Sequence, residues 1–248
     1  MMKACTVIPS RLASTRLPRK VLADINGKPM LYYVWQQVSQ AKRVSDIYIA
    51  TDSEEVCSAA VGWGAQVMMT SPDCRSGTER IASILHLLPG ELILNVQGDE
   101  PLIDPGLLDA MVAEWEQQGG DIITPVYPIL DVADLLNPNI VKVVRTQAGR
   151  ALYFSRNPIP YVRDLPVERW LEKHQFWGHA GVYGYRRDVL RAYPGLLSSP
   201  LEVAESLEQL RFLDAGYHIQ TVETQYRPVA VDTHADLDRV RQILEKQT

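Results

Sequence analysis

Short apolar segments alternate with longer amphipathic ones along the first half of this 248-residue chain. The apolar segments are rich in β-branched residues, as buried strands are, and the amphipathic ones carry apolar residues at helical spacing. Because strand, helix and strand in this order form a βαβ unit, the alternation predicts a parallel sheet covered by helices. The predicted strands are 4–8, 47–51, 66–69 and 92–96, and the predicted helices are 29–41, 54–61, 78–87 and 104–118.

The second half of the chain has a different pattern. Four more strand-like segments follow with fewer helices between them, which indicates antiparallel strands that extend a mixed sheet. These strands are 122–127, 141–145, 151–155 and 181–185, and two late helices are predicted at 199–213 and 233–246. Residues 157–175 contain three prolines and many charges, so we expect a long excursion from the core. We predict one domain over 1–248, with an inserted subregion around 130–185.

The composition is ordinary for a globular protein, at 46% hydrophobic and 22% charged residues, so the chain can bury a large core without disulfide bonds. Its three cysteines, Cys5, Cys57 and Cys74, are scattered, which indicates free thiols in a reducing compartment. The longest apolar run, 30–35, is far shorter than the roughly 20 residues of a membrane span. A predicted strand follows Lys3 directly, so we expect no signal peptide, no membrane insertion and a cytoplasmic location.

The net charge of −5 gives no reason to expect a nucleic-acid partner. A chain of this charge that binds an anion must gather its cations locally. Residues 9–20 do so, because four cations, Arg11, Arg16, Arg19 and Lys20, fall within ten residues after the first predicted strand. In an open α/β sheet, ligands bind beyond the carboxyl ends of strands, where this loop would suit phosphate oxygens. The alternative is a solvated basic loop.

Two aspartates follow other predicted strands. Asp99 lies in the segment 95–101, just past the strand 92–96, where a carboxylate can hold Mg²⁺ on a polyphosphate. The alternative is a Gly-Asp turn that leads into the next helix. Asp232 ends the short apolar segment 229–231 and precedes a helix, so it is either a second metal ligand or part of the helix entry.

Further motifs mark helix starts. Ser76 and Glu79 have the spacing of a capping box, whereas Arg80 would place a cation in the first helical turn, against the helix dipole. Arg80 therefore needs a partner, such as Glu79, Asp73 or a ligand. Ser199, Pro200 and Glu202 mark the start of a helix. On one continuous helix, the polar face would hold Glu205, Glu208 and Gln209 with Phe212, and the apolar face Val203, Leu207 and Leu210.

Taken together and in order, these motifs resemble those of the 3-deoxy-manno-octulosonate (Kdo) cytidylyltransferase family. The resemblance spans nearly the whole chain, and the ordered combination is far more specific than any single segment. The segments that carry it are 9–18, 26–30, 50–52, 76–80, 95–101, 151–156, 181–185, 199–202, 207–211 and 231–233.

The resemblance implies the reaction CTP + Kdo → CMP-Kdo + pyrophosphate, which activates Kdo for lipopolysaccharide synthesis. It also implies a three-layer α/β/α nucleotide-diphospho-sugar transferase fold with a mixed, mostly parallel sheet, a Mg²⁺ cofactor and a homodimer. The inserted subregion around 130–185 would then serve sugar binding and dimerisation. The anomeric hydroxyl of the sugar would attack the α-phosphorus in line with the departing pyrophosphate, so no protein nucleophile is required.

The resemblance also implies roles for individual residues. Asp99 and Asp232 match metal ligands, and together with Lys20 and Arg11 they match the catalytic residues. The positions that match the nucleotide site are Pro9, Ser10, Arg11, Thr15, Arg16, Lys20, Thr51, Asp52, Ser76, Gly77, Thr78 and Arg80. The positions that match the sugar site are Gln97, Arg156, His179, Tyr183, Glu208 and Gln209.

The sequence departs from the family pattern in several places. Arg19 stands where members often have Gly, His234 and Ala235 replace a more usual Pro-Glu, and residues 157–176 match poorly. The sugar therefore stays open between Kdo, 8-amino-Kdo and another sugar acid such as a sialic acid. A non-catalytic nucleotide-sugar-binding protein and a glycosyltransferase of similar topology are the alternatives of other classes.

Overall fold

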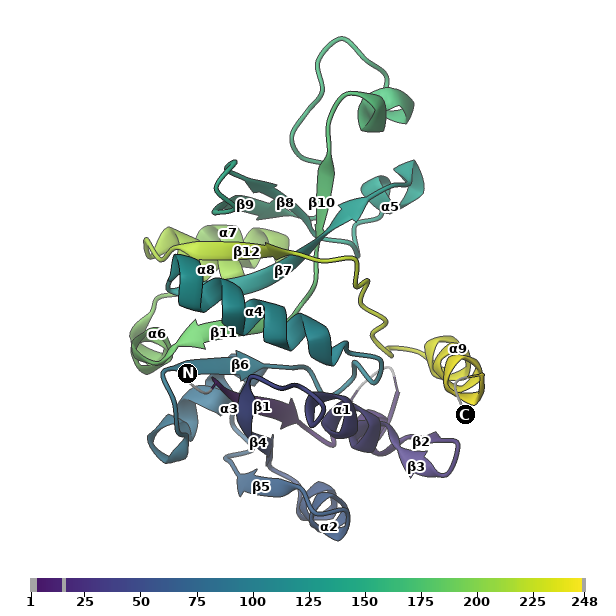
Figure 1. Ribbon diagram of the computed structural model, residues 1–248, viewed down its shortest axis with the longest axis vertical. Coiled ribbons are helices and arrows are strands. Elements are labelled where there is room, and N and C mark those ends of the chain that lie inside the picture. The colour runs from purple at the N-terminus through teal and green to yellow at the C-terminus, as the bar shows by residue number, and fades with distance from the viewer. Residues whose placement is uncertain (1–3, 15–16, 247–248) are drawn as a thin grey trace. The chain divides into compact units, whose positions relative to one another are not determined.

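The structure is a computed structural model that describes residues 4–14 and 17–246. These residues form two compact units, each built from separate stretches of the chain (Figure 1). The first unit contains 1–112, 182–194 and 228–248, and the second contains 113–181 and 195–227. Helix α4 (Pro105–Gln118) contributes residues to both units.

The first unit is built on a mostly parallel sheet. Its strands are β1 (Ala4–Ser10), β4 (Val44–Thr51), β5 (Gln66–Met69), β6 (Leu92–Asn95) and β11 (Tyr183–Arg186). They lie in the order β5-β4-β1-β6-β11, with β11 antiparallel to β6 and the other pairs parallel. Every residue of β1 is buried, which explains why its sequence is mostly apolar, without the alternation of a half-exposed strand.

The strand order reverses direction next to β1. The chain runs from β1 outward through β4 to β5 and then returns to the other side of β1 as β6. Right-handed crossovers therefore put α3 on the face of the sheet opposite to α1 and α2. The gap between the carboxyl ends of β1 and β6 is a topological switch point, where open α/β sheets bind ligands. The loops that begin at Ser10 and at Asn95 leave the sheet at this point.

The helices of the first unit follow the predicted alternation. They are α1 (Met30–Val38), α2 (Glu54–Gly62), α3 (Gly77–Ser83), α6 (Arg187–Ala192) and α9 (His234–Glu245). Short 3₁₀ helices η1 (Lys20–Leu22) and η2 (Leu85–Leu87) and the small pair β2 (Asp24–Ile25) and β3 (Lys28–Pro29) complete it. The predicted helix 78–87 is thus α3 followed by η2, and 3₁₀ helix η4 (Tyr193–Gly195) follows α6.

The second unit carries the antiparallel part of the predicted sheet. Its strands are β7 (Ile122–Ile129), β8 (Lys142–Arg145), β9 (Ala151–Ser155), β10 (Phe176–His179) and β12 (Ile219–Glu223). The pairs β7–β10, β10–β8 and β8–β9 are antiparallel, whereas β12 runs parallel to β7. Strands β10 and β12 were not predicted: β10 has Gly178 at its centre, and β12 is a short alternating run.

The helices of the second unit correct one prediction. They are α5 (Val132–Leu136), the 3₁₀ helix η3 (Val167–Glu172), α7 (Pro200–Glu205) and α8 (Gln209–Asp214). The continuous helix predicted over 199–213 is wrong, because the chain leaves the helical path at Ser206, which has φ +52°. At the break, the Arg156 guanidinium donates to the carbonyls of Glu205 (2.7 Å) and Ser206 (3.3 Å). Of the predicted apolar face, Leu207 and Leu210 are buried, whereas Val203 is exposed.

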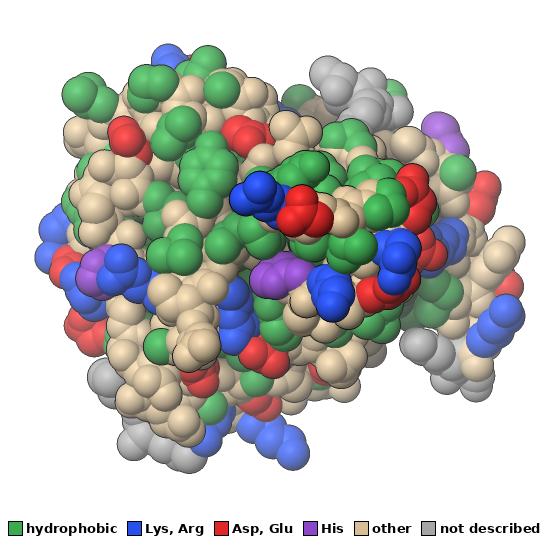
Figure 2. Space-filling model, turned by 90° about the horizontal axis from the view of Figure 1, so that it is seen from above, with side chains coloured by type: hydrophobic (Ala, Val, Ile, Leu, Met, Phe, Trp, Pro, Cys, Tyr) green, Lys and Arg blue, Asp and Glu red, His purple; other side chains and the backbone are tan. Residues whose placement is uncertain are grey.

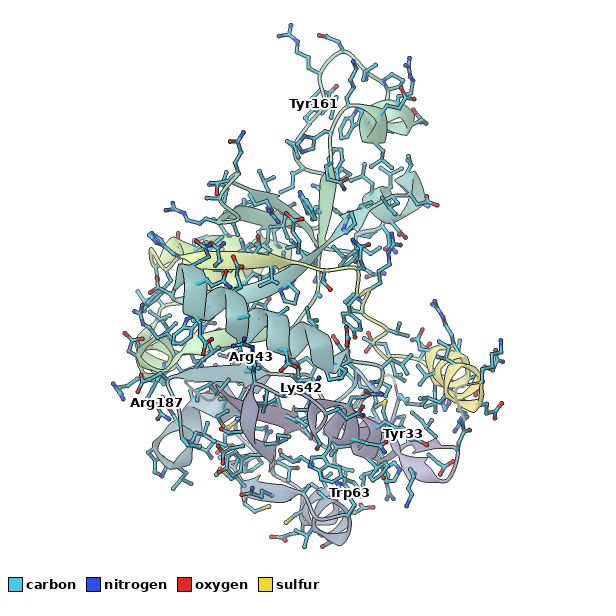
Figure 3. All side chains as sticks on the ribbon, in the orientation of Figure 1. Tyr33, Lys42, Arg43, Trp63, Tyr161 and Arg187 are labelled. Carbon is cyan, nitrogen blue, oxygen red and sulfur yellow. The ribbon has the colours of Figure 1, made fainter. Side chains whose placement is uncertain are left out.

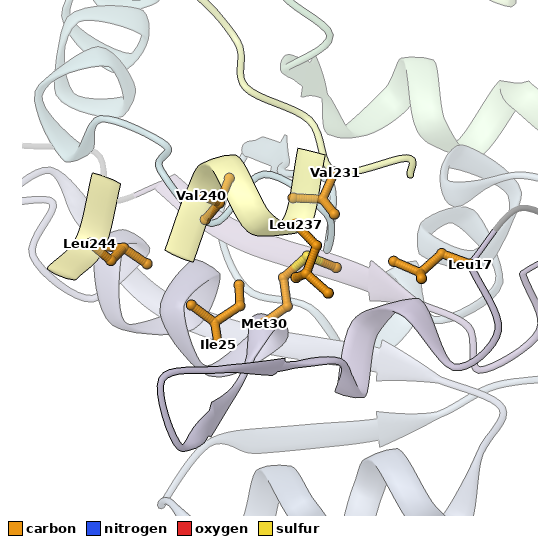
Figure 4. Close-up of a cluster of buried hydrophobic side chains, with 7 residues drawn as sticks. All are labelled: Leu17, Ile25, Met30, Val231, Leu237, Val240 and Leu244. Atoms are coloured by element: carbon orange, nitrogen blue, oxygen red, sulfur yellow. The ribbon is translucent and has the colours of Figure 1, made fainter. Parts of the chain in front are cut away.

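A hydrophobic cluster attaches the last helix to the segment that follows the basic loop (Figure 4). Leu237, Val240 and Leu244 on α9 pack with Met30, at the start of α1, and Ile25. The cluster also includes Leu17 and Val231, which lie beside two of the predicted functional segments. Burial of these side chains therefore fixes the segment around Lys20 against the segment around Asp232, although the two are more than 200 residues apart.

The excursion between β9 and β10 has a small core of its own. Trp170 on η3 stacks on Phe176 of β10 at 6.0 Å and meets Tyr161 edge to face at 5.0 Å. Tyr161 itself is 74% exposed (Figure 3). In the described part of the chain, no helix has the length and apolar character needed to cross a bilayer. On the face in Figure 2, basic and acidic side chains are interspersed and form no continuous basic field.

Candidate functional site

A cavity of about 230 Å³ opens in the first unit at the switch point between β1 and β6. The loop after β1, the start of α3, the loop after β6 and Asp232 form its walls. Its lining residues are Pro9, Ser10, Arg11, Ala13, Ser14, Lys20, Val21, Cys74, Arg75, Ser76, Gly77, Arg80, Gln97, Gly98, Asp99 and Asp232. The basic loop and the segments of Ser76, Asp99 and Asp232, each predicted separately from the sequence, therefore surround the same cavity.

Two glycines allow the three loops to approach closely. A Cβ on Gly98 would lie 2.6 Å from Ser10 Oγ and 3.2 Å from the carbonyl oxygen of Pro9. A Cβ on Gly77 would lie 2.9 Å from Cγ of Pro9. The 2.6 Å and 2.9 Å distances are shorter than real Cβ contacts, so a side chain at either position would push the walls apart. The glycines of the two predicted motifs thus have a packing function in the cavity.

Asp99 and Asp232 converge on the ammonium group of Lys20. Lys20 Nζ donates to Asp99 Oδ2 at 2.5 Å and to Asp232 Oδ1 at 3.0 Å. Burial lowers the pKa of Lys20, but the two carboxylates outweigh this effect and leave that pKa above its ordinary value. The two aspartates form a place for a cation, and in this structure a lysine from the basic loop lies there.

The helix entry at Asp232 does not use the Asp232 carboxylate as a cap. Thr233 Oγ1 accepts from the backbone N–H of Asp236, and the Asp236 carboxylate accepts from that of Thr233, which is a complete capping box. The backbone N–H of Val231 donates to the Asp99 carbonyl at 3.0 Å and ties the two aspartate loops together. Residues 236–238 form an Asp-x-Asp triplet, but the two carboxylates have other partners than a metal. Asp236 caps α9, and Asp238 pairs with Arg241.

Arg80 is buried and has a partner that the sequence did not indicate. Its guanidinium pairs with Asp52 Oδ2 at 3.1 Å, and it also donates to Thr70 Oγ1. Neither Glu79 nor Asp73 is that partner. Ser76 caps α3 as predicted by accepting from the N–H of Glu79 at 3.1 Å. The Glu79 carboxylate instead accepts from the N–H of Arg75 at 2.8 Å, so the reciprocal half of the predicted capping box is absent.

Three of the residues predicted for the nucleotide site, Thr51, Asp52 and Thr78, do not line the cavity. Thr51 is buried at the end of β4 and accepts from the N–H of Ser53, while Thr78 is buried on α3 beside the Tyr185 hydroxyl at 3.4 Å. Thr15 and Arg16 lie outside the described residues. Arg75 and Gly98 line the cavity and were not singled out, although Arg75 is a cation directly before the Ser76 motif.

The residues predicted to bind the sugar are divided between the two units. Gln97 lines the cavity of the first unit and donates to Asn95 Oδ1 at 3.0 Å. Tyr183, on β11 of the same unit, stacks on Tyr185 at 5.6 Å. The other four, Arg156, His179, Glu208 and Gln209, belong to the second unit.

His179 is a neutral histidine held by the second unit. Its Nε2 is hydrogen-bonded to Thr124 Oγ1 of β7 at 2.8 Å, and Phe154 meets the ring edge to face. Desolvation lowers the pKa of His179 to about 3, so the ring carries no charge near neutral pH. A neutral imidazole can exchange hydrogen bonds with sugar hydroxyls, but it cannot neutralise a carboxylate.

Arg156 is occupied with backbone groups. Besides Glu205 and Ser206 it donates to the Pro138 carbonyl at 3.0 Å, and its own N–H donates to the Glu205 carboxylate at 2.9 Å. On the next helix, Glu208 is the N-cap residue of α8, and Gln209 is 5% exposed. The Gln209 amide nitrogen is among the few buried side-chain atoms of the described residues with no hydrogen-bond partner.

Comparison with known proteins settles the family. Residues 5–221 match the family described as Cytidylyltransferase. The 3-deoxy-manno-octulosonate cytidylyltransferase of Chlorobium phaeobacteroides is 44% identical, over 98% of this chain and 98% of the relative. That of Geobacter metallireducens is 42% identical, over 99% of each.

The chain belongs to the 3-deoxy-manno-octulosonate cytidylyltransferase family. A solved structure of CMP:2-keto-3-deoxy-manno-octonic acid synthetase complexed with CTP superposes with a TM-score of 0.93 at 39% identity, covering 99% of this chain and 100% of the other. A glucose-1-phosphate thymidylyltransferase from Bacillus anthracis is 17% identical with a TM-score of 0.65, which shows that the fold extends to other nucleotidyltransferases. The predicted α/β nucleotide-diphospho-sugar transferase fold is confirmed.

Arg19, one of the departures from the expected family pattern, has a backbone conformation that Gly adopts most easily. Its φ is +58° and its ψ +31°, in the left-handed region. For a residue with a Cβ this conformation costs about 1–2 kcal/mol. The Arg19 guanidinium pairs with Glu55 in the first turn of α2 and not with the cavity carboxylates. The bulk and charge of Arg19 therefore point away from Asp99 and Asp232, and the backbone before Lys20 keeps a conformation that suits Gly.

The stability of the second unit should depend on the protonation of one buried lysine. Lys142 Nζ donates to the carbonyls of Asn137 (2.9 Å) and Ile140 (2.6 Å). Burial, together with repulsion from Arg156, lowers the pKa of Lys142 to about 8, against the attraction of Glu205. The unfolded chain keeps this proton up to about pH 10.5, so between pH 8 and 10.5 the unfolded state binds more protons and folding gains stability as the pH rises.

The size of the effect follows from the shift. A pKa lowered by roughly 2.5 units corresponds to about 3 kcal/mol. Urea unfolding of the wild type and Lys142→Met at pH 7, 8, 9 and 10.5 measures it. We expect the free energy of unfolding of the wild type, relative to that of Lys142→Met, to rise by about 3 kcal/mol over this pH range. A difference between the two proteins that stays constant with pH would show that the Lys142 pKa is ordinary.

Proposed function

We propose that the chain transfers CMP from CTP to the anomeric oxygen of Kdo, releasing pyrophosphate, with Mg²⁺ as its cofactor. The observation that carries the proposal is the convergence of Asp99 and Asp232 on one cation position beside a basic loop, in a cavity at the switch point of the sheet. The names of the relatives and of the CTP-bound structure support the choice of CTP and Kdo.

The donor set fits Mg²⁺. Carboxylate oxygens are ligands that this ion prefers, and it is commonly bound by one or two carboxylates together with substrate phosphates. Within residues 4–14 and 17–246, no group of three or more His, Cys, Asp or Glu side chains could hold a metal. Asp99 and Asp232 would therefore hold the ion jointly with substrate oxygens and water. When bound, Mg²⁺ would neutralise phosphate charge and lower the pKa of the attacking hydroxyl.

The side chains of the cavity suit the other demands of the reaction. Arg11 and Lys20 line the cavity with positive charge, and preorganised charge of this kind could stabilise the departing pyrophosphate. Ser76 and Gly77, where α3 begins, also line the cavity and would contact the nucleotide there. In the second unit, the unpaired amide nitrogen of Gln209 and the neutral ring of His179 supply hydrogen bonds suited to sugar hydroxyls.

Release of pyrophosphate from the purified chain tests the proposal. CTP is supplied with Kdo, 8-amino-Kdo or N-acetylneuraminate, in Mg²⁺ or in EDTA, and UTP with Kdo controls for the base. We expect turnover with CTP, Kdo and Mg²⁺, and none in EDTA. Turnover only with 8-amino-Kdo or the sialic acid would replace Kdo as the substrate. No release with any sugar would favour a non-catalytic nucleotide-sugar-binding protein.

We also propose that the chain forms a homodimer. Support comes from large apolar side chains that the second unit exposes, namely Leu130 (69%), Leu136 (50%) and Tyr161 (74%). Contiguous exposed apolar surface marks protein–protein interfaces, and a dimer that covered these side chains would remove them from water. Light scattering after size-exclusion chromatography measures the mass in solution, and a mass near the 27.9 kDa of one chain at micromolar concentration would contradict the dimer.

A further inference from the structure

The cation position formed by Asp99 and Asp232 is filled by the chain itself. Lys20 Nζ contacts one oxygen of each carboxylate, and its side chain is only 14% exposed. The arrangement is held from several sides. The cluster with α9 fixes the segments before and after Lys20 against the segment of Asp232, and the Val231 N–H binds the Asp99 carbonyl. The carboxylates therefore stay together and keep the lysine between them.

A divalent cation cannot enter this position while Lys20 remains in it. An ammonium group at 2.5–3.0 Å from the two oxygens already neutralises part of their charge and would repel a second cation at the same oxygens. Without a nucleotide, a displaced Lys20 would lose both ion pairs and gain only water. A polyphosphate in the adjoining cavity changes this balance, because it offers the flexible lysine a new anion within the same space.

We propose that Lys20 occupies the metal position in the ligand-free chain and leaves it for the nucleotide phosphates, so that the metal binds well only after the nucleotide has drawn the lysine away. The inference rests on the proposed function, since it takes Asp99 and Asp232 as the metal ligands. Lys20 then has two binding positions, and its transfer between them links metal binding to nucleotide binding. By linkage, any change that favours Lys20 on the carboxylates lowers the affinity for the metal alone and for the nucleotide alone.

The test measures Mn²⁺ binding without nucleotide. Phosphate oxygens then cannot bind the ion, so a change in affinity reports the effect of Lys20 alone. The fraction of free Mn²⁺ is followed by electron paramagnetic resonance in the wild type and in Lys20→Met, with no CTP present. We expect the variant to bind Mn²⁺ about 10–100-fold more tightly than the wild type. Equal affinities of the two proteins for Mn²⁺ alone would overturn the exchange.

The controls address charge, folding and the location of the ion. Arg19→Ala removes the same charge from the neighbouring residue, which pairs with Glu55 and not with the aspartates, and should change Mn²⁺ affinity less than threefold. An equal gain in Arg19→Ala and Lys20→Met would reduce the effect to general electrostatics and overturn the exchange. Lys20→Gln is the second variant in case the methionine disturbs folding, which thermal unfolding by circular dichroism reports.

A further variant distinguishes failure of the exchange from failure of the proposed metal site. Adding Asp99→Asn to Lys20→Met should abolish the gain in Mn²⁺ affinity. If Mn²⁺ binds the wild type with CTP and Asp99→Asn removes that binding, the metal site holds. An unchanged Mn²⁺ affinity in Lys20→Met, or an equal gain in Arg19→Ala, would then refute the exchange alone. If Asp99→Asn affects Mn²⁺ binding in neither background, the ion binds elsewhere, and both proposals fail.

Discussion

Replacing Asp99 by Asn is expected to lower kcat for pyrophosphate release about a thousandfold while the chain remains folded. Asparagine preserves the shape of the side chain but removes one of the two charges that would hold Mg²⁺. A thousandfold loss corresponds to about 4 kcal/mol, within the range of metal charge stabilisation in a transition state. Folding should survive, because the Asp99 side chain is 26% exposed and its backbone carbonyl still accepts from Val231.

Asp238→Asn is the matched control for this change. Asp238 lies on α9, six residues after Asp232, and its side chain is 64% exposed in a pair with Arg241. Such surface pairs contribute at most about 1 kcal/mol to stability, so this variant should keep wild-type kcat and unfold nearly as the wild type does. Steady-state kinetics with saturating CTP and Kdo, together with thermal unfolding, compare the two. An Asp99→Asn enzyme with kcat within threefold of the wild type would exclude the metal role.

The parallel half of the fold could be predicted from the sequence because its determinants are local. Runs such as 4–8 and 92–96 are apolar and β-branched, and they alternate with helices at regular intervals, so β1 and β6 form close to where they were expected. The helix predicted over 199–213 failed for the opposite reason. At its break, the Ser206 carbonyl binds Arg156, which is some 50 residues away in sequence, and such a distant contact is not visible in the local pattern.

Some features of the candidate site could likewise be predicted from local sequence, and others could not. The rule that ligands bind beyond the carboxyl ends of strands correctly grouped the loops of Ser10 and Asp99 around one cavity. The contact of Lys20 with Asp232 was not predictable, because packing of α9 brings the two segments together. The pairing of Arg80 with Asp52 was also missed, since sequence proximity favoured Glu79 and Asp73, whereas the true partner follows a neighbouring strand of the sheet.

That pairing leads to the largest expected effect on stability. Arg80, on α3, is 3% exposed and connects α3 to Asp52 after β4 and to Thr70 after β5. Arg80→Met should lower the free energy of unfolding by about 3–5 kcal/mol, because removing one partner of a buried ion pair leaves the other charge uncompensated. In a chain of this size that corresponds to a fall in Tm of roughly 10 °C. The KM for CTP should also rise, since Arg80 lines the cavity.

Asp52→Asn completes a double-mutant cycle that isolates the pair. If the loss in Arg80→Met comes from the uncompensated Asp52 charge, adding Asp52→Asn should recover about 2 kcal/mol, because no buried charge then lacks a partner. Strictly additive losses would show that Arg80 acts by packing and by its bond to Thr70. Arg80→Lys refines the result: it keeps the charge but cannot reach Asp52 and Thr70 as a fork, so its stability should fall between the wild type and Arg80→Met.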